Sequence, residues 1–282
     1  MYDSVMLDVG GTFVKYGAMR QGQFCLKGQF PIREEGRPEE ILQPILDFLT
    51  AHPAPRVVIC MPGPADYAMG ISQMTHKFKS IQGFPMKSWL EERLEGARVS
   101  FLHDGVAFVL GEMTAGALRG ADCAACVMLG TGLGFGLCRR GRVLVRPART
   151  PAHPLWCAPW KGGICEDFVS GRALRKIWQA RTGQRQDVHE IAALARLGDE
   201  AAAELFRQAG RTLGEMLRDH LSGWPVERVA VGGQIAKSWD LFAESYAEAC
   251  PIPATAAGRL EDAALWGDYA YAQHGDDILA AN

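Results

Sequence analysis

Apolar residues near the start of the chain come in short runs that predict three consecutive strands. One run covers residues 5–9, a second covers residues 12–19 after two glycines, and a third covers residues 23–30 after a Gln-Gly turn. Short apolar runs bounded by glycine are typical of strands. Because tight turns join the three runs, we predict an antiparallel meander, which differs from the strand–helix start of a dinucleotide-binding fold.

Helical spacing follows, and the strand pattern then recurs in the second half of the chain. Residues 38–50 and 106–118 have apolar side chains three or four positions apart, which predicts helices. Further short apolar runs predict strands at residues 56–60, 99–102, 124–129, 134–138, 142–145 and 228–231. Two strand–glycine–strand starts therefore occur far apart in the chain, which indicates a duplicated α/β unit.

Chain length gives a prediction for the domains. The chain has 282 residues, more than one compact core usually holds. We expect a small N-terminal α/β lobe at residues 1–118 and a larger C-terminal α/β lobe at residues 119–282. In this prediction the last helix can pack back on the N-terminal lobe.

Composition and charge narrow the class of protein. Hydrophobic residues make up 48% of the chain and charged residues 22%, which is typical of a globular protein. The 30 basic and 32 acidic side chains nearly balance, so no broad field attracts nucleic acid or an anionic membrane. Residues 1–11 do not resemble a signal peptide, and no apolar run approaches the ~20 residues that span a membrane. We expect a cytoplasmic protein with reduced thiols and neither of those partners.

The first motif that could bind a ligand is the glycine pair after the first strand. Gly10 and Gly11 allow backbone N–H groups to approach a phosphate without obstruction by a Cβ atom. Thr12 offers a hydroxyl group to the same anion, Lys15 offers a cation, and Asp8 can hold the hydration shell of Mg²⁺. A hairpin turn explains the same residues, so both interpretations stay open.

A second glycine-rich segment follows the strand at residues 124–129. Gly130, Thr131 and Gly132 open a run with glycine at alternate positions, which can form another backbone cradle for an anion. The spacings G-x-G-x-x-G and G-x-x-x-x-G-K-[ST] do not occur, which excludes the corresponding nucleotide-binding motifs. A tight hairpin is the alternative interpretation.

A third glycine pair ends the strand at residues 228–231. Gly232 and Gly233 lie between this strand and a helix that begins near Gln234. Such a turn can accommodate a flat purine and its ribose close to the backbone. A plain strand–helix connection has the same sequence pattern.

Asp104 follows the strand at residues 99–102 and stands beside His103. A carboxylate at the C-terminal end of a strand lies where α/β sheets bind their ligands. Aspartate is also a common N-cap of a following helix, and without neighbouring motifs the cap is the simpler interpretation.

Together, the order and spacing of these motifs resemble the actin-like ATPase and sugar-kinase superfamily, and within it the ROK family (repressors, open reading frames, kinases). The resemblance implies an α/β, two-lobed actin-like ATPase (ribonuclease H-like) fold with a duplicated α/β unit and an interlobe cleft. It spans nearly the whole chain, through Asp8-x-Gly10-Gly11-Thr12-x-x-Lys15, Met61-Pro62-Gly63-Pro64-Ala65-Asp66, His103-Asp104 with Gly111-Glu112, Leu129 to Gly136, Glu166 with Ser170-Gly171-Arg172, and Ala263 to Gly267.

The resemblance also implies a function. A protein of this kind would be an ATP-dependent sugar kinase that uses ATP and Mg²⁺ to phosphorylate the 6-hydroxyl group of a hexose or hexose derivative, and it would form a homodimer. The three glycine segments would bind the nucleotide. Asp104 would be the general base, and Gly63, His103, His153 and Glu166 would bind the sugar with it.

Several departures from the family pattern concern zinc and the sugar. Family members hold a structural zinc with a histidine and three cysteines. Here His153, Cys157 and Cys165 offer three candidate ligands where a closed site needs four, so we expect no structural zinc. Thr150 replaces a sugar-binding glutamate and His103 replaces an asparagine, which predicts an unusual sugar.

Two questions stay open at this stage. The segment at residues 74–78 either faces the sugar or is a surface loop with one buried phenylalanine. A catalytically silent sugar-sensing or regulatory protein would have the same fold, although intact phosphate loops would be surplus to it. An ATPase of the actin or heat-shock type would not need Glu166-x-x-x-Ser170-Gly171.

Overall fold

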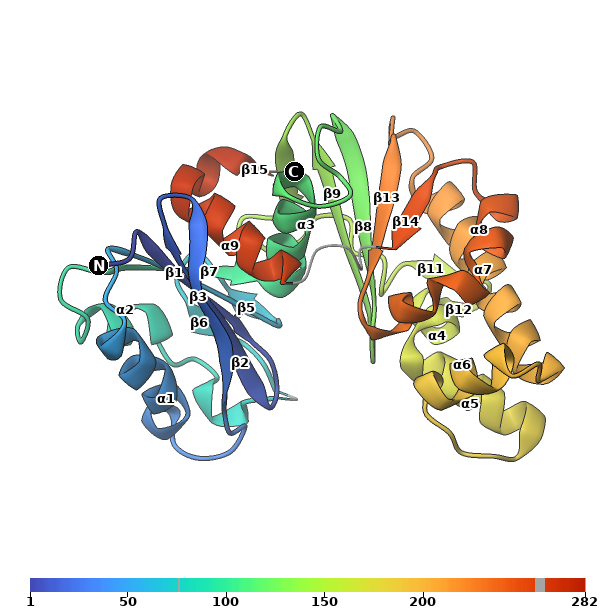
Figure 1. Ribbon diagram of the computed structural model, residues 1–282, viewed down its shortest axis with the longest axis horizontal. Helices are drawn as coiled ribbons and strands as arrows, with labels where there is room; N and C mark the ends of the chain where they lie inside the picture. Colours follow the sequence, from blue (N-terminus) through green and yellow to red (C-terminus); the bar gives the residue numbers. More distant parts are fainter. Residues whose placement is uncertain (76, 257–261, 282) are drawn as a thin grey trace. The chain divides into compact units, whose positions relative to one another are not determined.

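The computed structural model describes residues 1–75, 77–256 and 262–281, and the chain groups into two compact units (Figure 1). Unit 1 comprises Met1–Ala115, Arg142–Ala152 and Asp262–Asn282, and unit 2 comprises Gly116–Gly141 and His153–Glu261. Two segments beyond residue 118 therefore group with the N-terminal part of the chain. A single boundary at residue 118 does not describe this grouping.

Unit 1 contains a five-stranded sheet with the order β3-β2-β1-β4-β7. The first three strands, β1 (Ser4–Val9), β2 (Phe13–Arg20) and β3 (Gln23–Pro31), pair antiparallel, so the predicted meander is confirmed. The other two, β4 (Arg56–Met61) and β7 (Arg98–His103), run parallel to β1.

Helices cover both faces of this sheet. Helices α1 (Pro38–Ala51) and α2 (Met86–Glu91) pack against one face, where Val5, Leu7 and Val9 join the main core. Helix α9 (Ala263–His274) covers the other face, where Met6 and Met19 pack against Leu265, and it lies beside α3 (Asp104–Thr114) (Figure 1). Because side chains alternate along a strand, Asp8 shares the face of Met6 that is covered by α9.

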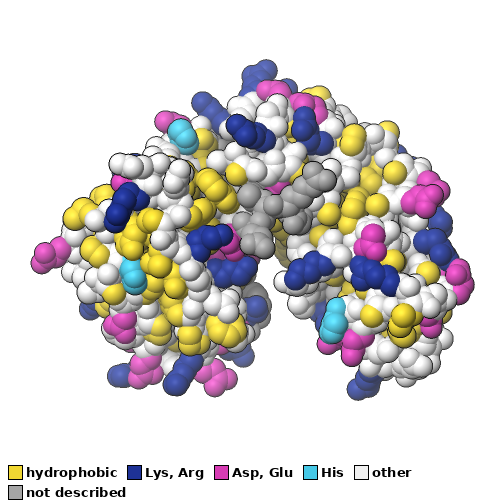
Figure 2. All heavy atoms as spheres, in the orientation of Figure 1, with side chains coloured by type: hydrophobic (Ala, Val, Ile, Leu, Met, Phe, Trp, Pro, Cys, Tyr) yellow, Lys and Arg dark blue, Asp and Glu magenta, His cyan; other side chains and the backbone are white. Residues whose placement is uncertain are grey.

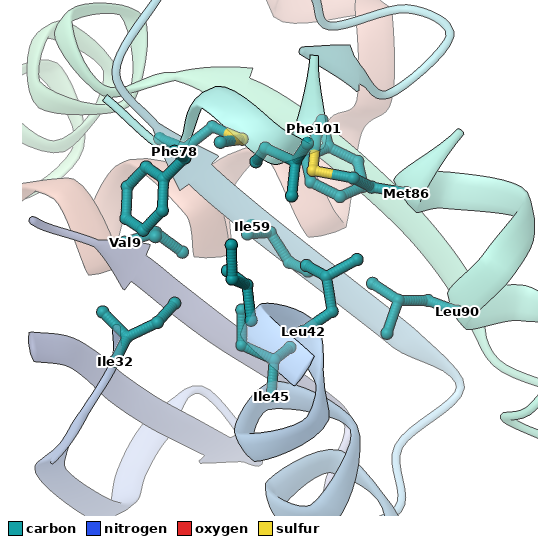
Figure 3. A pocket seen from close by; sticks show the side chains of 12 residues that line it. Val9, Ile32, Leu42, Ile45, Ile59, Phe78, Met86, Leu90 and Phe101 are labelled. Carbon is teal, nitrogen blue, oxygen red and sulfur yellow. The ribbon is translucent and has the colours of Figure 1, made fainter. Parts of the chain in front are cut away.

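An apolar pocket of only about 10 Å³ lies in the main core of unit 1 (Figure 3). A pocket without polar side chains offers no group to orient a sugar or a phosphate, so it belongs to the core rather than to a site. Its lining comes from the sheet, from α1 and α2 and from the connections between them, and consists of Val9, Ile32, Ile41, Leu42, Ile45, Ile59, Met61, Phe78, Ile81, Met86, Leu90 and Phe101.

Helices α3 and α9 approach each other so closely that only glycine fits at two positions. A methyl group built on Gly111 would collide with the carbonyl group of Ala263, and one built on Gly267 would collide with the carbonyl group of Ala107. The backbones of the two helices are therefore in direct contact.

Unit 2 repeats the strand order of unit 1. Strand β8 (Cys123–Leu129) pairs antiparallel with β9 (Leu133–Arg139) and parallel with β13 (Arg228–Gly232), which pairs parallel with β14 (Ala254–Ala256). The order β9-β8-β13-β14 matches β2-β1-β4-β7, both in the order of the strands along the chain and in their directions. This match agrees with the predicted duplication of an α/β unit.

The remaining elements are short or belong to the helical part of unit 2. In unit 2 these are β11 (Pro159–Trp160), β12 (Gly163–Ile164), α4 (Glu166–Val169), α5 (Gly171–Thr182), α6 (Val188–Arg196), α7 (Glu200–His220), the 3₁₀ segment η2 (Gln234–Leu241) and α8 (Ala243–Ala249). In unit 1 they are β5 (Ala65–Asp66), β6 (Ile71–Ser72), η1 (Lys79–Ile81), β10 (Arg142–Val145), η3 (Gly275–Ile278) and β15 (Leu279–Ala281).

Two surface properties agree with the composition. On the face shown in Figure 2, basic and acidic side chains are interspersed over both units, as the near-balanced charge of the chain leads one to expect. Among the described residues, no helix combines the length and the hydropathy that crossing a bilayer requires.

Candidate active site

The first glycine loop joins β1 to β2 in unit 1. Gly10 N–H donates to the carbonyl oxygen of Phe13 at 2.9 Å, and Ile32 N–H donates to that of Thr12, also at 2.9 Å. The surroundings of Gly11 leave no room for a side chain, because a methyl group there would lie 2.5 Å from Glu34 Oε1. The loop is thus a tight turn in which Gly10 N–H is already bonded.

Asp8 enters this loop from β1 with an unusual pKa. Burial is the main cause that raises the pKa of its carboxyl group to about 6, and the nearby charges of Asp104 and Asp262 raise it further. Lys15, which also lies 3.9 Å from Asp262, lowers it, and so does the thiol group of Cys60, whose Sγ is 3.7 Å from Asp8 Oδ1. Two carboxylates near each other repel, and a bound cation would relieve that repulsion.

A second buried carboxyl group lies behind Asp8. Asp268, on α9, is fully buried, and burial raises its pKa well above the usual range. The charge of Asp8 adds to this rise, whereas the thiol and backbone of Cys60 oppose it. The surroundings of Asp268 therefore favour its neutral form over its charged form. It was missed from the sequence because α9 comes at the opposite end of the chain from Asp8.

His103 and Asp104 stand at the junction of β7 and α3. The predicted helix at residues 106–118 is wrong at both ends, because α3 begins at Asp104 and ends at Thr114. Gly105 N–H lies 2.9 Å from His103 Nδ1, so His103 rather than Asp104 is the N-cap. The same N–H lies 2.7 Å from Asp104 Oδ1 and adds a hydrogen bond to the carboxylate.

The Asp104 carboxylate is held in its ionised form. Burial alone would raise its pKa, but the charge of His103, a hydrogen bond with that ring and the Gly105 N–H outweigh burial and lower the pKa. His103 Nδ1 is 2.9 Å from Asp104 Oδ1; the ring donates to this oxygen when protonated and accepts from Gly105 when Nδ1 is bare. The Asp104 side chain is 46% exposed, so a substrate can reach it.

Gly63 and Tyr67 complete the group around His103. A methyl group on Gly63 would lie 2.9 Å from Tyr67 Oη and 3.4 Å from His103 Cδ2. The rings of Tyr67 and His103 meet edge to face at 5.5 Å, and Tyr67 Oη donates to the carbonyl oxygen of Met61 at 3.2 Å. Burial, followed by the charge of Asp104, raises the pKa of Tyr67. Tyr67 was also missed from the sequence.

The second glycine loop lies between β8 and β9 in unit 2 and is tied to Glu166. Gly130 N–H donates to the carbonyl oxygen of Gly132 at 3.0 Å, which closes the loop around Thr131. Glu166 Oε2 accepts from Leu133 N–H at 2.8 Å, and a methyl group on Gly132 would lie 2.7 Å from the same oxygen.

Helix α5 holds this loop from the other side. Gly171 N–H donates to the carbonyl oxygen of Gly130 at 2.8 Å, and Arg172 forms an ion pair with Glu166. The Glu166 side chain is 17% exposed, and both of its oxygens have partners in the structure. The residue that the family resemblance assigns to the sugar therefore also braces the second glycine loop.

An open pocket of about 460 Å³ in unit 2 adjoins this loop. Gly233 has φ of 87° and packs against the backbone of Leu129, which brings the third glycine pair, including Gly232, beside the second glycine loop. The lining combines predicted residues with basic side chains that were missed from the sequence, and it consists of Gly130, Thr131, Gly171, Arg175, Asp187, Val188, His189, Arg196, Gln234, Ile235, Lys237 and Ser238. Such a mixture suits a nucleoside with attached phosphates.

The three zinc candidates make other contacts. The ring of His153 packs edge to face against Trp224 at 5.2 Å, and its carbonyl oxygen lies 3.1 Å from Nε2 of His220. Cys157 is exposed, whereas Cys165 is buried, and burial raises the pKa of Cys165 to about 11. Among the described residues, no group of three or more His, Cys, Asp or Glu side chains is arranged to hold a metal ion.

With this geometry in place, the family can be stated. The model of the ROK family matches residues 4–274. The chain belongs to the ROK family. The glucokinase of Thermotoga maritima is 26% identical over 265 residues, which cover 84% of this chain and 83% of that relative.

Solved structures of ROK proteins share the fold. The ROK hexokinase of Thermus thermophilus matches with a TM-score of 0.80 at 24% identity, over 96% of this chain and 99% of that one. A ROK glucokinase of Streptomyces griseus, solved with glucose and AMPPNP, matches with a TM-score of 0.72 at 23% identity, over the same shares. The predicted fold class, α/β of the actin-like ATPase type, is thereby confirmed.

Proposed function

We propose that the protein is an ATP-dependent carbohydrate kinase that transfers the γ-phosphoryl group of ATP to the 6-hydroxyl group of a hexose or hexose derivative. The observation that carries this proposal is the partly exposed, ionised carboxylate of Asp104 beside His103, in the same unit as the glycine loop at residues 10–12. Membership of the ROK family and the kinase relatives support the class of reaction.

In this proposal the nucleotide is bound by the glycine segments. The pocket of unit 2 takes the nucleoside, and the backbone N–H groups of Thr131 and Gly132 and of Gly11 and Thr12 bind phosphate oxygens. Arg175 and Lys237 line the same pocket and supply positive charge. Fixed donors of this kind stabilise the charge that spreads over the phosphoryl oxygens during transfer.

Asp104 acts as the general base. Its carboxylate accepts the proton of the sugar hydroxyl group while the oxygen of that group attacks the phosphoryl group. The hydrogen bond from Gly105 N–H, and that from His103 when its ring is protonated, keep it ionised before the reaction. Gly63, His103 and Tyr67 shape the sugar side of the site, and Glu166 and His153 bind further hydroxyl groups.

A divalent metal fits the residues of unit 1. Burial, followed by the charge of Asp104, raises the pKa of Asp8, and a bound cation would favour the ionised form of this carboxyl group. Carboxylate oxygens and retained water are the ligands that Mg²⁺ prefers, and Asp8 is the residue that would hold its hydration shell. The ion would neutralise phosphate charge when bound. No structural zinc belongs to this proposal.

The test is a coupled ADP-release screen across hexoses, amino sugars, N-acetyl sugars and glycosides. Asp104→Asn should bind sugar but lose about 10²–10⁴-fold in kcat, because the amide cannot accept the proton. Asp47→Asn, a change at an exposed carboxylate on α1, is the matched control and should keep wild-type turnover.

Two outcomes would count against the proposal. Wild-type kcat in Asp104→Asn would remove this residue from the role of base. Sugar binding by the wild-type protein without turnover on any sugar would favour a sugar-sensing or regulatory protein instead. Family analogy suggests a homodimer. If sedimentation shows that the protein is a homodimer, all of these measurements are made on the dimer.

A further inference from the structure

Lys77 is a cation whose backbone is fixed by the residue that follows it. Phe78 has φ of 46°, in the left-handed region, and its side chain is only 1% exposed. Figure 3 shows the Phe78 ring inside the apolar pocket of unit 1, near Val9. A buried aromatic anchor limits the movement of the segment, so Lys77 is held at a defined place. His76, on its other side, lies outside the described residues.

The ammonium group of Lys77 lies at the first glycine loop. A methyl group built on Gly11 would lie 3.3 Å from Lys77 Nζ and 2.5 Å from Glu34 Oε1. The charged ends of both side chains are therefore at the part of the loop where backbone N–H groups can meet an anion. A lysine offers three donors to a phosphate, whereas a carboxylate offers none.

The same ammonium group acts on the proposed base. Burial raises the pKa of Asp104, and His103 and Gly105 lower it. The charge of Lys77 also lowers it, by less than they do. Lys77 thus lies close enough to influence both the glycine loop and Asp104. With the residues that the structure describes, it makes neither an ion pair nor a hydrogen bond, so its donors are available to a ligand.

We propose that Lys77 is a further catalytic residue, whose ammonium group binds the terminal phosphoryl group of ATP between the Gly10–Gly11 loop and Asp104. This inference rests on the proposed kinase function. In the reaction the sugar oxygen forms a bond to the γ-phosphorus, the bond from that phosphorus to the β–γ bridging oxygen breaks, and the sugar proton goes to Asp104. Lys77 stays protonated throughout and balances charge on the transferred group.

Glu34 lies at the same part of the glycine loop as Lys77. Its carboxylate is beside the same glycine as the ammonium group of Lys77 and repels a phosphate oxygen. An incoming phosphoryl group would therefore have to displace the Glu34 side chain, which is the far end of a flexible chain.

Nucleotide binding tests the contact without any knowledge of the sugar. The dissociation constants of MgADP and Mg-AMPPNP, which differ by the terminal phosphoryl group, are measured calorimetrically for the wild-type protein, Lys77→Met and Lys79→Met. Lys77→Met should weaken AMPPNP by about tenfold or more, since a hydrogen bond to a charged group is worth roughly that factor. ADP should change less than about twofold. Lys79, exposed two residues further on, is the matched control and should change neither.

Other binding results would overturn the proposal. Equal weakening of AMPPNP and ADP would mean that Lys77 only supports the loop. An unchanged AMPPNP affinity would remove the contact. If the wild-type protein bound neither nucleotide, the kinase function itself would fall, and this inference with it.

Turnover with an active sugar separates a phosphoryl contact from a sugar contact. Lys77→Met should lower kcat by about 10²-fold or more with the KM for sugar little changed, because the contact strengthens as charge develops on the transferred group. Lys77→Arg keeps the charge and should recover part of the loss. A rise in the KM for sugar at unchanged kcat would instead assign Lys77 to the sugar and refute the proposal.

Discussion

Asp8 and Asp104 both follow strands of one sheet, yet their surroundings move their pKa values in opposite directions. Burial and the charge of Asp104 raise that of Asp8 to about 6, whereas His103 and Gly105 lower that of Asp104 despite burial. Different environments are how one site gives two carboxyl groups different tasks. An ionised Asp104 suits a base. Asp8, whose charged form is disfavoured, suits a residue that gains a cation.

The raised pKa of Asp8 has a consequence for stability. Its unfolded value is 3.8 and its folded value is about 6, so the folded protein binds more protons between these values. The free energy of unfolding therefore falls as pH rises through this window, and the stability is present below the unfolded pKa. Asp8→Asn removes the titration and should be inactive but relatively more stable at neutral pH.

Denaturant unfolding of both proteins at a series of pH values measures this effect. The free energy of unfolding of Asp8→Asn relative to wild type should rise by up to about 3 kcal/mol from about pH 4 to about pH 7.5. A comparison across pH cancels the constant effects of the amide. A difference that is flat with pH, or that shrinks as pH rises, would contradict the assignment of the raised pKa to Asp8.

At the scale of elements, the sequence predicted what depends on local pattern. Strands β1, β2, β4, β7, β8 and β13 and helix α1 were found because apolar periodicity and glycine turns are local signals. The limits of α3 were wrong because its N-cap depends on the His103 side chain, and Ala115 leaves the helix with φ of −136°.

The candidate site was predictable only in part, for the same reason. The glycine loops and Asp104 stand in recognisable segments. Arg175 and Lys237 come from α5 and η2, and they line one pocket only after the fold brings those elements together. Asp268 reaches Cys60 and Asp8 from the last long helix, and no spacing in the sequence marks that contact.

The contact between α3 and α9 gives a prediction at this scale. In Gly267→Ala the new methyl group would meet the carbonyl group of Ala107 on α3, so the helices must separate. Overpacking of this kind typically costs up to about 3 kcal/mol, and roughly 2–4 °C in Tm follows for each kcal/mol in a chain of this size. Differential scanning calorimetry measures the loss.

A surface change on α3, the helix against which α9 packs, serves as the control. Thr114→Ala lies at the exposed end of α3 and should change stability by less than about 0.5 kcal/mol. Because α3 begins with Asp104, Gly267→Ala should also reduce turnover although it lies outside the catalytic residues. A wild-type Tm for Gly267→Ala would mean that the two helices are not in backbone contact.

At the scale of the whole molecule, unit 1 is assembled from both ends of the chain. Helix α9 supplies Leu265 to the small core with Met6 and Met19, and β15 pairs parallel with β10. Strands β14, β13, β8 and β9 of the second sheet come from unit 2, whereas its strands β10 and β15 come from segments grouped with unit 1. The C-terminal segment is therefore structural material for the sheet that presents Asp8, although it carries none of the phosphate loops.

A chain ending at residue 261 tests this organisation. Without α9 the face of the sheet that carries Met6 loses its cover, and α3 loses the helix that packs against its backbone. Hydrogen exchange followed by mass spectrometry should show lost protection in β1, β4 and α3, with protection retained in β8, β13 and α7. Leu265→Ala, which removes only part of the same core, should lower stability by about 2–5 kcal/mol and leave all these elements protected. Protection of β1 and β4 at the full-length level in the shortened chain would show that unit 1 folds without its C-terminal segment, and equal loss in both units would show that they do not fold separately.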